Sequence, residues 1–378
     1  MKWIISFIDR KKFFDSEPDV HLIIRAVDIF NFGFDKSNID VINSVLLSLN
    51  STKTTYNVYF LEDLGVRNCS LLSNEDIFRW LFDLFCIRLN KNKLKFVFSY
   101  NFIVNNSHFL DKFFDYFSKQ MLLNRKKSLE IVGNVVCNNL EQFKDVLLNV
   151  KLTDQFSIFY FVPYDDCNLD FLKVREDLIT LAKDRMFSFY VDFDFDFVKT
   201  GDLRSYFSFL KNFLVFYLED LIKLGCRIWT FDSMLNLKGT HCFAGDCVKN
   251  NFIIDFSGNV FLCLKSVLSG GPFIRLGNIF EDKVDNKNVL NWFLSNRFRK
   301  KLLKRQEEDR LCSCDYWDLC HQVCVFMERS YETNDCVKFF EFLTKEAYPI
   351  YMSIRREAVK QELGRYLSYY NNILKGGY

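Results

Sequence analysis

The chain has 378 residues, of which 49% are hydrophobic and 26% charged, so it is long enough to bury one large core or two to three smaller ones. Its formal net charge of +2 gives no strong field that would attract nucleic acid or an anionic membrane. No stretch has the ~18 uncharged residues of a spanning helix, and residues 1–19 lack the pattern of a signal peptide. We therefore expect a cytoplasmic protein with no nucleic-acid and no membrane partner.

Residues 1–54 have the least regular pattern and are treated as a separate N-terminal segment. Within them, residues 21–33 are compatible with a strand or a hairpin, and residues 37–50 have the apolar spacing of a helix. No linker rich in Gly, Ser or Pro separates this segment from the chain after residue 54.

From about residue 55 to residue 240, short β-rich runs alternate with amphipathic helical stretches. The expected strands cover residues 55–62, 94–100, 128–136, 156–163, 186–195 and 226–232. The expected helices cover residues 74–91, 107–124, 139–150, 168–183 and 202–224. Repeated βα units imply a parallel sheet with right-handed crossovers. The α/β class follows, with a partial (β/α)6 barrel as the expected arrangement and a doubly wound sheet as the alternative.

After residue 240 the pattern changes. Residues 248–264 form two alternating runs around Ser257, Gly258 and Asn259, which predicts a β-hairpin. The cysteines also gather here. Of the 13 in the chain, five are scattered and fit buried small hydrophobic residues: Cys69, Cys86, Cys137, Cys167 and Cys226. The other eight fall in the last third: Cys242, Cys247, Cys263, Cys312, Cys314, Cys320, Cys324 and Cys336.

These eight thiols call for a chemical explanation. An odd total in a long chain without a secretion signal argues against a disulfide framework. Thiolates at short spacing bind iron–sulfur clusters or zinc. Zinc ribbons usually pair two C-x2-C knuckles, and the chain contains none. An iron–sulfur site is therefore favoured, and the alternative is several buried thiols with a single zinc.

The spacing carries a resemblance. Cys247 is followed by ten residues, Gly258, four residues and Cys263, and a second set reads C-x-C-x5-C-x3-C from Cys312 to Cys324, before a last cysteine at Cys336. This pattern resembles the SPASM domain that follows the barrel of many radical S-adenosylmethionine enzymes that mature peptides and sulfatases. GNVFLC, a strand that ends on its cysteine, and LGNIFED at residues 276–282, a turn between the two halves, also resemble that family. One departure is the single residue between Cys312 and Cys314, where the family has two.

The resemblance implies two auxiliary 4Fe-4S clusters in a SPASM domain over residues 241–345, with a helical tail over residues 346–378. The first cluster would use Cys242, Cys247, Cys263 and Cys324. The second would use Cys312, Cys314, Cys320 and Cys336.

The resemblance also implies a radical S-adenosylmethionine barrel over residues 55–240, and the motif of that barrel is missing. The family holds its catalytic cluster with C-x3-C-x2-C after the first strand, and no such spacing occurs in the chain. After the run at 55–62, residues 63–81 contain a single cysteine, Cys69. The family's glycine-rich turn is also absent after the run at 95–103, where Ser99, Tyr100 and Asn101 stand instead. We therefore expect no bound S-adenosylmethionine and no radical activity.

Other candidate motifs are weaker. Asp192, Asp194 and Asp196 alternate with phenylalanine and fit a strand with one solvent-facing side better than a cation site. His321, beside Cys320, fits a surface residue better than a partner that tunes a cluster. The basic run at residues 297–305 fits a solvated helix face.

The resemblance extends to barrel-degenerate SPASM proteins that accompany radical S-adenosylmethionine maturases or ATP-grasp ligases in the modification of ribosomal peptides. It implies a non-catalytic subunit that binds a precursor peptide or relays electrons to such an enzyme. Two alternatives remain: an active radical enzyme whose cluster site escapes recognition, and a protein whose clusters only stabilise its fold.

Overall fold

The structure is a computed structural model that describes a set of separate ranges along the chain. The described residues are 19–26, 28, 36–51, 54–62, 75–91, 93–124, 130–137, 140–149, 156–161, 171–184, 188–189, 191–192, 203–235, 251–264, 267, 275–284, 288–309, 334–357 and 360.

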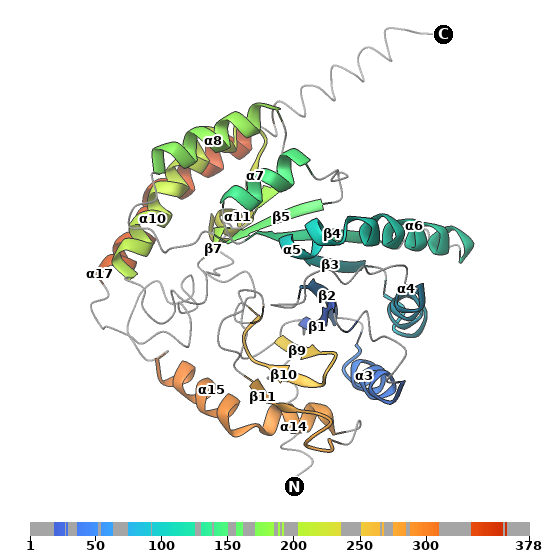
Figure 1. The fold of residues 1–378 in the computed structure, drawn as a ribbon. Coiled ribbons are helices and arrows are strands. Elements are labelled where there is room, and N and C mark those ends of the chain that lie inside the picture. The colour runs from blue at the N-terminus through green and yellow to red at the C-terminus, as the bar shows by residue number, and fades with distance from the viewer. Residues whose placement is uncertain are drawn as a thin grey trace, which may run out of the picture.

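A large, mostly parallel sheet forms the centre of the described fold (Figure 1). Its strand order is β11-β10-β9-β1-β2-β3-β4-β5-β7. The strands are β1 (Asp19–Arg25), β2 (Thr55–Leu61), β3 (Lys93–Ser99), β4 (Glu130–Cys137), β5 (Phe156–Phe161), β7 (Val191–Asp192), β9 (Asn251–Asp255), β10 (Asn259–Phe261) and β11 (Arg275–Asn278). Strands β9 to β7 pair in parallel, whereas β10 and β11 are antiparallel to their neighbours. The expected α/β class is confirmed.

Helices follow the parallel strands in chain order. They are α3 (Lys36–Ser48), α4 (Glu75–Phe82), α5 (Tyr100–Asn105), α6 (Ser107–Leu123), α7 (Leu140–Asn149), α8 (Phe171–Asp184), α10 (Leu203–Phe216), α11 (Trp229–Leu235), α14 (Val289–Ser295), α15 (Arg297–Asp309) and α17 (Asn334–Phe342), with π-helical turns η1 (Asp83–Arg88), η2 (Tyr217–Leu221) and η3 (Leu343–Ala347). The five helices expected between strands are all present. Strands β1 to β5 lie side by side in sequence order, and β9, which comes later in the chain, pairs with the other edge of β1. Among the described helices, none combines the length and apolarity needed to cross a bilayer.

The βα alternation begins earlier than the sequence pattern indicated. Strand β1 lies between β9 and β2, with Asp19 opposite both Thr55 and Asn251. The run at 55–62 is therefore the second strand, not the first. The connection after the true first strand, residues 26–35, contains no cysteine at all. The missing three-cysteine motif is thus absent after the first strand as well as after the second.

The expected strand at residues 226–232 is mostly wrong. Only Arg227 and Ile228 are extended, as β8, which pairs with β6 (Ser188–Phe189) in a separate two-stranded sheet. Helix α11 follows at once, because Phe231, Met234 and Leu235 are buried at helical spacing. The sequence predicted a strand here because residues 226–232 are rich in aromatic and β-branched residues.

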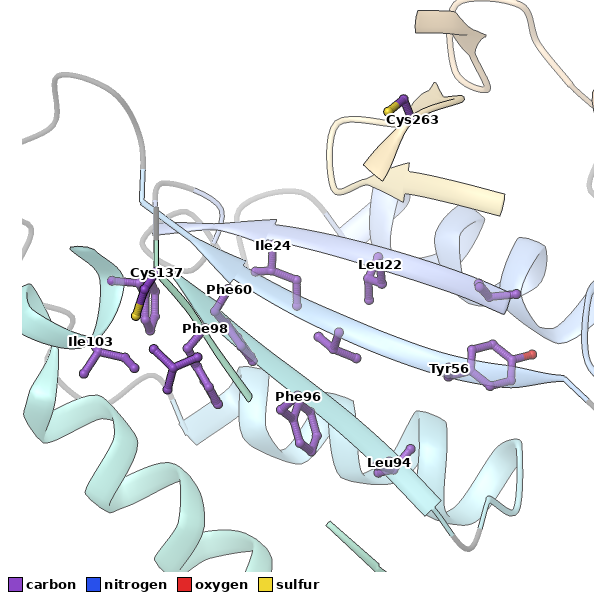
Figure 2. Close-up of a cluster of buried hydrophobic side chains, with 14 of the residues drawn as sticks. Leu22, Ile24, Tyr56, Phe60, Leu94, Phe96, Phe98, Ile103, Cys137 and Cys263 are labelled. Carbon is purple, nitrogen blue, oxygen red and sulfur yellow. The ribbon is translucent and has the colours of Figure 1, made fainter. Parts of the chain in front are cut away.

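Phenylalanine fills the space between the sheet and its helices. Alternate residues of β1, β2 and β3 enter one hydrophobic cluster with α3, α4 and α6, as Figure 2 shows for Leu22, Ile24, Phe60, Phe96 and Phe98. On α6, the ring of Phe113 lies 5.7 Å from that of Phe60 and 4.8 Å from that of Phe96, both edge to face. Such aromatic pairs stabilise a core beyond the area they bury.

The opposite face of the sheet carries a smaller apolar cluster. It contains Ile23, Tyr59, Leu61, Val97, Val136, Ile253, Phe261, Leu264 and Val267. No residue of a described helix that follows β1 to β5 belongs to it. The helices therefore gather on one face, as sequential right-handed crossovers require.

The C-terminal third packs on the rest of the described fold through several elements, among them β9 and α17. Strand β9 joins the sheet beside β1, so the predicted hairpin extends the same sheet. Helix α17 packs on α10, where the ring of Phe207 lies 5.4 Å from that of Phe339. Described elements on both sides of residues 310–333, β9 before them and α17 after them, therefore pack on the βα unit. The proposed domain boundaries stay predictions.

Candidate metal centre

The structure describes the side chain of one of the eight predicted ligands. This residue is Cys263, which follows β10 and is buried. Cys336 lies near the start of α17, and only its backbone is described. The other predicted ligands lie outside the described residues: Cys242, Cys247, Cys312, Cys314, Cys320 and Cys324. Among the described residues, no three His, Cys, Asp or Glu side chains form a metal-binding group.

The predicted hairpin that leads to Cys263 is confirmed. Strands β9 and β10 are antiparallel, with Val260 opposite Ile254. The turn closes through a 3.0 Å hydrogen bond from the amide of Gly258 to the carbonyl of Asp255. Gly258 has φ of +79°, a conformation that side chains other than glycine's adopt at a cost. The backbone conformation of the turn therefore favours glycine at position 258, the glycine of the SPASM-like spacing.

A second reason is crowding by the 276–282 turn. A Cβ on Gly258 would lie 2.6 Å from the ring of Phe280, which is too close for a real contact. The amide of Ile279 also donates a 2.9 Å hydrogen bond to the carbonyl of Gly258. The hairpin and the LGNIFED turn, recognised separately in the sequence, therefore pack directly on each other.

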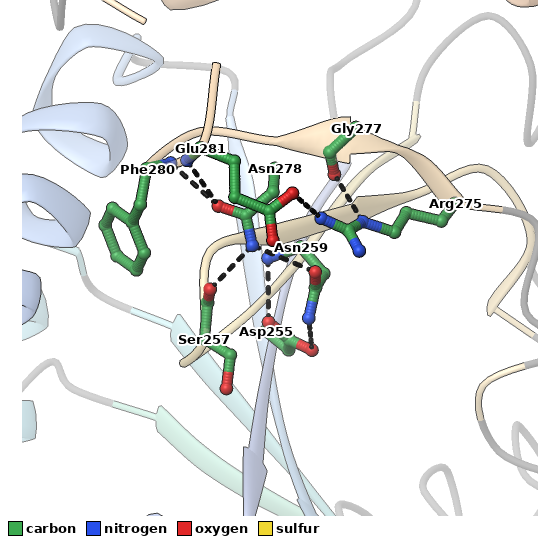
Figure 3. Close-up of polar contacts among 8 residues, drawn as sticks. All are labelled: Asp255, Ser257, Asn259, Arg275, Gly277, Asn278, Phe280 and Glu281. Carbon is green, nitrogen blue, oxygen red and sulfur yellow. Dashed lines mark hydrogen bonds and ion pairs between the residues drawn. The ribbon is translucent and has the colours of Figure 1, made fainter. Parts of the chain in front are cut away.

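Buried polar side chains link these two stretches (Figure 3). The amide of Asn278 donates from Nδ2 to the carbonyl of Ser257 and to Oδ1 of Asn259, both at 2.9 Å, and its Oδ1 accepts from the backbone amides of Phe280 and Glu281. Asn259 in turn donates from Nδ2 to Oδ2 of Asp255 at 2.9 Å.

The buried end of this network is Asp255, whose pKa burial raises. The hydrogen bonds from Asn259 and the charge of Arg25 act in the opposite direction and favour the carboxylate. The polar side chains of the turn are thereby paired, so the hairpin that carries Cys263 is held in one geometry.

Cys263 lies in apolar surroundings suited to a shielded cluster. It is 5% exposed, between the fully buried Leu262 and Leu264, and belongs to the same hydrophobic cluster as Val260 and Ile279. Figure 2 shows it beside the end of β10. Burial without a metal disfavours a thiolate, whereas coordination deprotonates it. A buried thiol at the end of a hydrogen-bonded hairpin is compatible with the predicted role of an iron–sulfur ligand, which the other seven thiols of the last third would share.

The ends of β2 and β3 carry capped and paired side chains. Strand β3 runs directly into α5, and Oγ of Ser99 caps that helix by accepting from the amide of Phe102 at 3.3 Å. The hydroxyl of Tyr100 donates to Asp145 on α7 at 2.8 Å. At the end of β2, Glu62 accepts from Nδ2 of Asn105. The residues after β3, which the sequence pattern placed at a glycine-rich turn, therefore cap and begin a helix, and counted from β1 they follow the third strand, not the second.

Sequence reasoning missed the buried His21. It lies on the sheet face opposite the helices, is 4% exposed, and its Nδ1 lies 3.1 Å from the hydroxyl of Tyr59. Burial lowers its pKa to about 3, with the interaction of its ring with the Asn251 side chain opposing the shift and the charge of Lys95 adding to it. A neutral histidine therefore lies in the middle of the sheet. Its place at an alternating strand position among apolar residues was the available signal.

The scattered cysteines can be compared in part with their expected role. Cys86, Cys137 and Cys226 are buried in the hydrophobic core, as expected. Burial raises the pKa of Cys137, so this thiol stays protonated and unreactive. Cys69 and Cys167 lie outside the described residues, as do His321, Asp194 and Asp196.

Comparisons of the chain with protein-family models, with curated proteins and with solved structures found no match.

Proposed function

We propose that this chain is a SPASM-type iron–sulfur protein with a degenerate partial (β/α)6 barrel. Its eight C-terminal cysteines would hold two 4Fe-4S clusters, in the two sets that the resemblance gives. An odd number of cysteines and a thiol-ligated cofactor suit a reducing compartment, and we propose the cytoplasm.

One observation carries the proposal. Gly258, Asn259 and Cys263 belong to one motif, and the 276–282 turn to another. The structure joins them through the contact of Gly258 with Phe280 and the hydrogen bond of Asn259 with Asn278. Two stretches that the resemblance picked out independently thus support each other physically.

The strand order of the sheet supports the partial barrel. Strands in sequential order with helices on one face form a sheet that coils toward closure. The opposite face, with Ile23, Tyr59 and Val97, would then line the interior.

The sequence supports a non-catalytic role for this barrel. Neither residues 26–35 nor residues 63–74 contain three cysteines, and the residues after β3 begin helix α5 rather than a glycine-rich turn. We propose that the chain binds a precursor peptide, or relays electrons, as the partner of a radical S-adenosylmethionine maturase or an ATP-grasp ligase. A 4Fe-4S cluster supplies one-electron transfer, and the residues of this chain position it and shield it from water.

Anaerobic reconstitution with iron and sulfide tests the proposal. Two clusters predict about eight irons per chain, with no 5′-deoxyadenosine formed from S-adenosylmethionine and a strong reductant. About twelve irons with such cleavage would favour the alternative of an active radical enzyme. Stoichiometric zinc without a visible chromophore would overturn the cluster assignment. Full iron content without any effect of gene deletion on peptide modification would favour the alternative of clusters that only stabilise the fold.

A further inference from the structure

Helix α15 presents a row of cations to solvent. Arg297, Lys300, Lys301 and Lys304 are all exposed and recur at helical spacing, so they lie on one face. Leu302, on the opposite face, is buried. We call these four residues the cationic stripe. It spans about 10 Å along the helix axis.

The stripe is fixed relative to the sheet. Asn296 caps α15, because its Oδ1 accepts from the amides of Phe298 at 3.1 Å and Arg299 at 3.2 Å. Its Nδ2 donates to the carbonyl of Leu276 on β11 at 3.1 Å. The guanidinium of Arg299 is buried and lies 4.5 Å from the centre of the Phe293 ring. The same turn that packs on the Cys263 hairpin therefore anchors this helix.

The order of charges along α15 is unfavourable for the helix dipole. Cations gather in its first two turns, at the positive end of the helix dipole, and the acidic residues Glu307, Glu308 and Asp309 end it, at the negative end. The stripe also places like charges three and four residues apart, as in Arg297 with Lys301 and Lys300 with Lys304. Helix formation does not explain this order of charges.

Ion pairs with described acids do not account for the first three cations of the stripe, whereas Lys304 has an interaction of its own. None of the ion pairs between described residues includes Arg297, Lys300 or Lys301. The exposed ring of Phe298 adds apolar surface beside the row. A fixed, linear row of cations at the positive end of a helix fits a linear anionic partner.

We propose that the cationic stripe binds an acidic segment of the precursor peptide. This inference rests on the proposed function and names the chemistry of its peptide. Side chains on one face of an extended peptide recur about every 6.8 Å, so two or three acids on alternate residues match the length of the stripe. Asp309, the last residue of α15, lies three residues before Cys312, so the helix that carries the stripe is followed directly in sequence by the predicted cluster ligands.

Fluorescence anisotropy on the full, reconstituted chain tests the inference. The probe is a fluorescein-labelled decapeptide of alternating Glu and Gly, titrated at low ionic strength because exposed charges are screened by salt. The triple variant Arg297→Glu/Lys300→Glu/Lys301→Glu should bind at least about ten-fold more weakly than the unchanged chain. A matched control reverses three exposed lysines elsewhere, Lys112→Glu/Lys183→Glu/Lys223→Glu, and should keep the affinity.

Weaker binding by the stripe variant should not result from loss of folding. The stripe variant places acids at the N-terminal end of α15, where the dipole favours them, so its thermal midpoint should not fall. Absence of binding by the unchanged chain, or equal weakening in both triple variants, overturns the inference. Equally strong competition by a single-stranded oligonucleotide of the same charge also overturns it, because the stripe would then bind any polyanion. Iron counts on the same samples separate this failure from failure of the proposed function.

Discussion

Asn278 donates a hydrogen bond from its Nδ2 to Oδ1 of Asn259 at 2.9 Å, across 19 residues of sequence. Asn259 in turn donates a hydrogen bond from its Nδ2 to the buried carboxyl group of Asp255. The first turn after β9 and the turn after β11 are therefore one polar unit. Because Cys263 lies four residues after Asn259, the rigidity of this unit determines where its sulfur is presented.

Replacing Asn278 should loosen this unit. Asn278→Ala removes the acceptor of two backbone amides and the donor to Ser257 and Asn259, within a buried site. We expect a loss of about 2–4 kcal/mol in the free energy of unfolding, because buried polar groups lose their partners. Urea unfolding followed by circular dichroism measures it. Asn124→Ala, at the exposed end of α6, is the control and should change stability by less than about 0.5 kcal/mol. Equal small effects would contradict the role given to Asn278.

A side chain at Gly258 should be costly for two separable reasons. Gly258→Ala forces alanine into a φ of +79° and brings its Cβ against Phe280. The conformation costs about 1 kcal/mol and the overlap about 1–3 kcal/mol more. In Gly258→Ala/Phe280→Ala the overlap disappears, so the two effects should not add. Simple additivity in urea unfolding would show that Phe280 does not limit this position.

Sequence reasoning identified the elements with strong periodicity. The five expected helices and the hairpin around Gly258 are present, since their apolar spacing and turn residues are local signals. It read residues 21–33 as a strand or a hairpin but left them outside the βα repeat, because β1 lies in a segment of irregular pattern. It also took Trp229–Leu235 for a strand, although Phe231, Met234 and Leu235 are buried as a helix.

Long-range relationships were beyond local patterns. Nothing in residues 251–255 indicated that β9 would pair with β1 and so join the hairpin to the main sheet. The burial of His21 between neighbouring strands likewise depends on register. The Asn259–Asn278 contact could have been guessed only from the polar residues that recur in both turns. The assignment of the cluster ligands rests chiefly on the spacing of the cysteines.

The buried His21 should make stability depend on pH. Its pKa in the folded chain is about 3, whereas an unfolded histidine titrates near 6.5. Below pH 6.5 the unfolded chain binds a proton that the folded chain excludes, so stability falls as pH falls, by about 1.4 kcal/mol per pH unit down to about pH 3. His21→Phe should remove this slope between pH 6.5 and 5, as measured by urea unfolding. Tyr59→Phe is the control, because it keeps a titrating histidine and should keep the slope. The same slope in His21→Phe and the unchanged chain would contradict a neutral buried His21.

The cluster assignment predicts which thiols carry iron. Cys263→Ala and Cys320→Ala should each remove about four of about eight irons, because they belong to different four-iron clusters, and the double variant should bind almost none. Both should also lower the thermal midpoint, since ligation contributes to the folding of cysteine-rich segments. Cys226→Ala truncates a buried core thiol and should lower stability while iron and sulfide counts stay unchanged. Cys69→Ala, after the second strand, should also keep all its iron. Loss of iron in Cys69→Ala would mean that Cys69 helps to hold a cluster, and the alternative of an active radical enzyme would then be favoured.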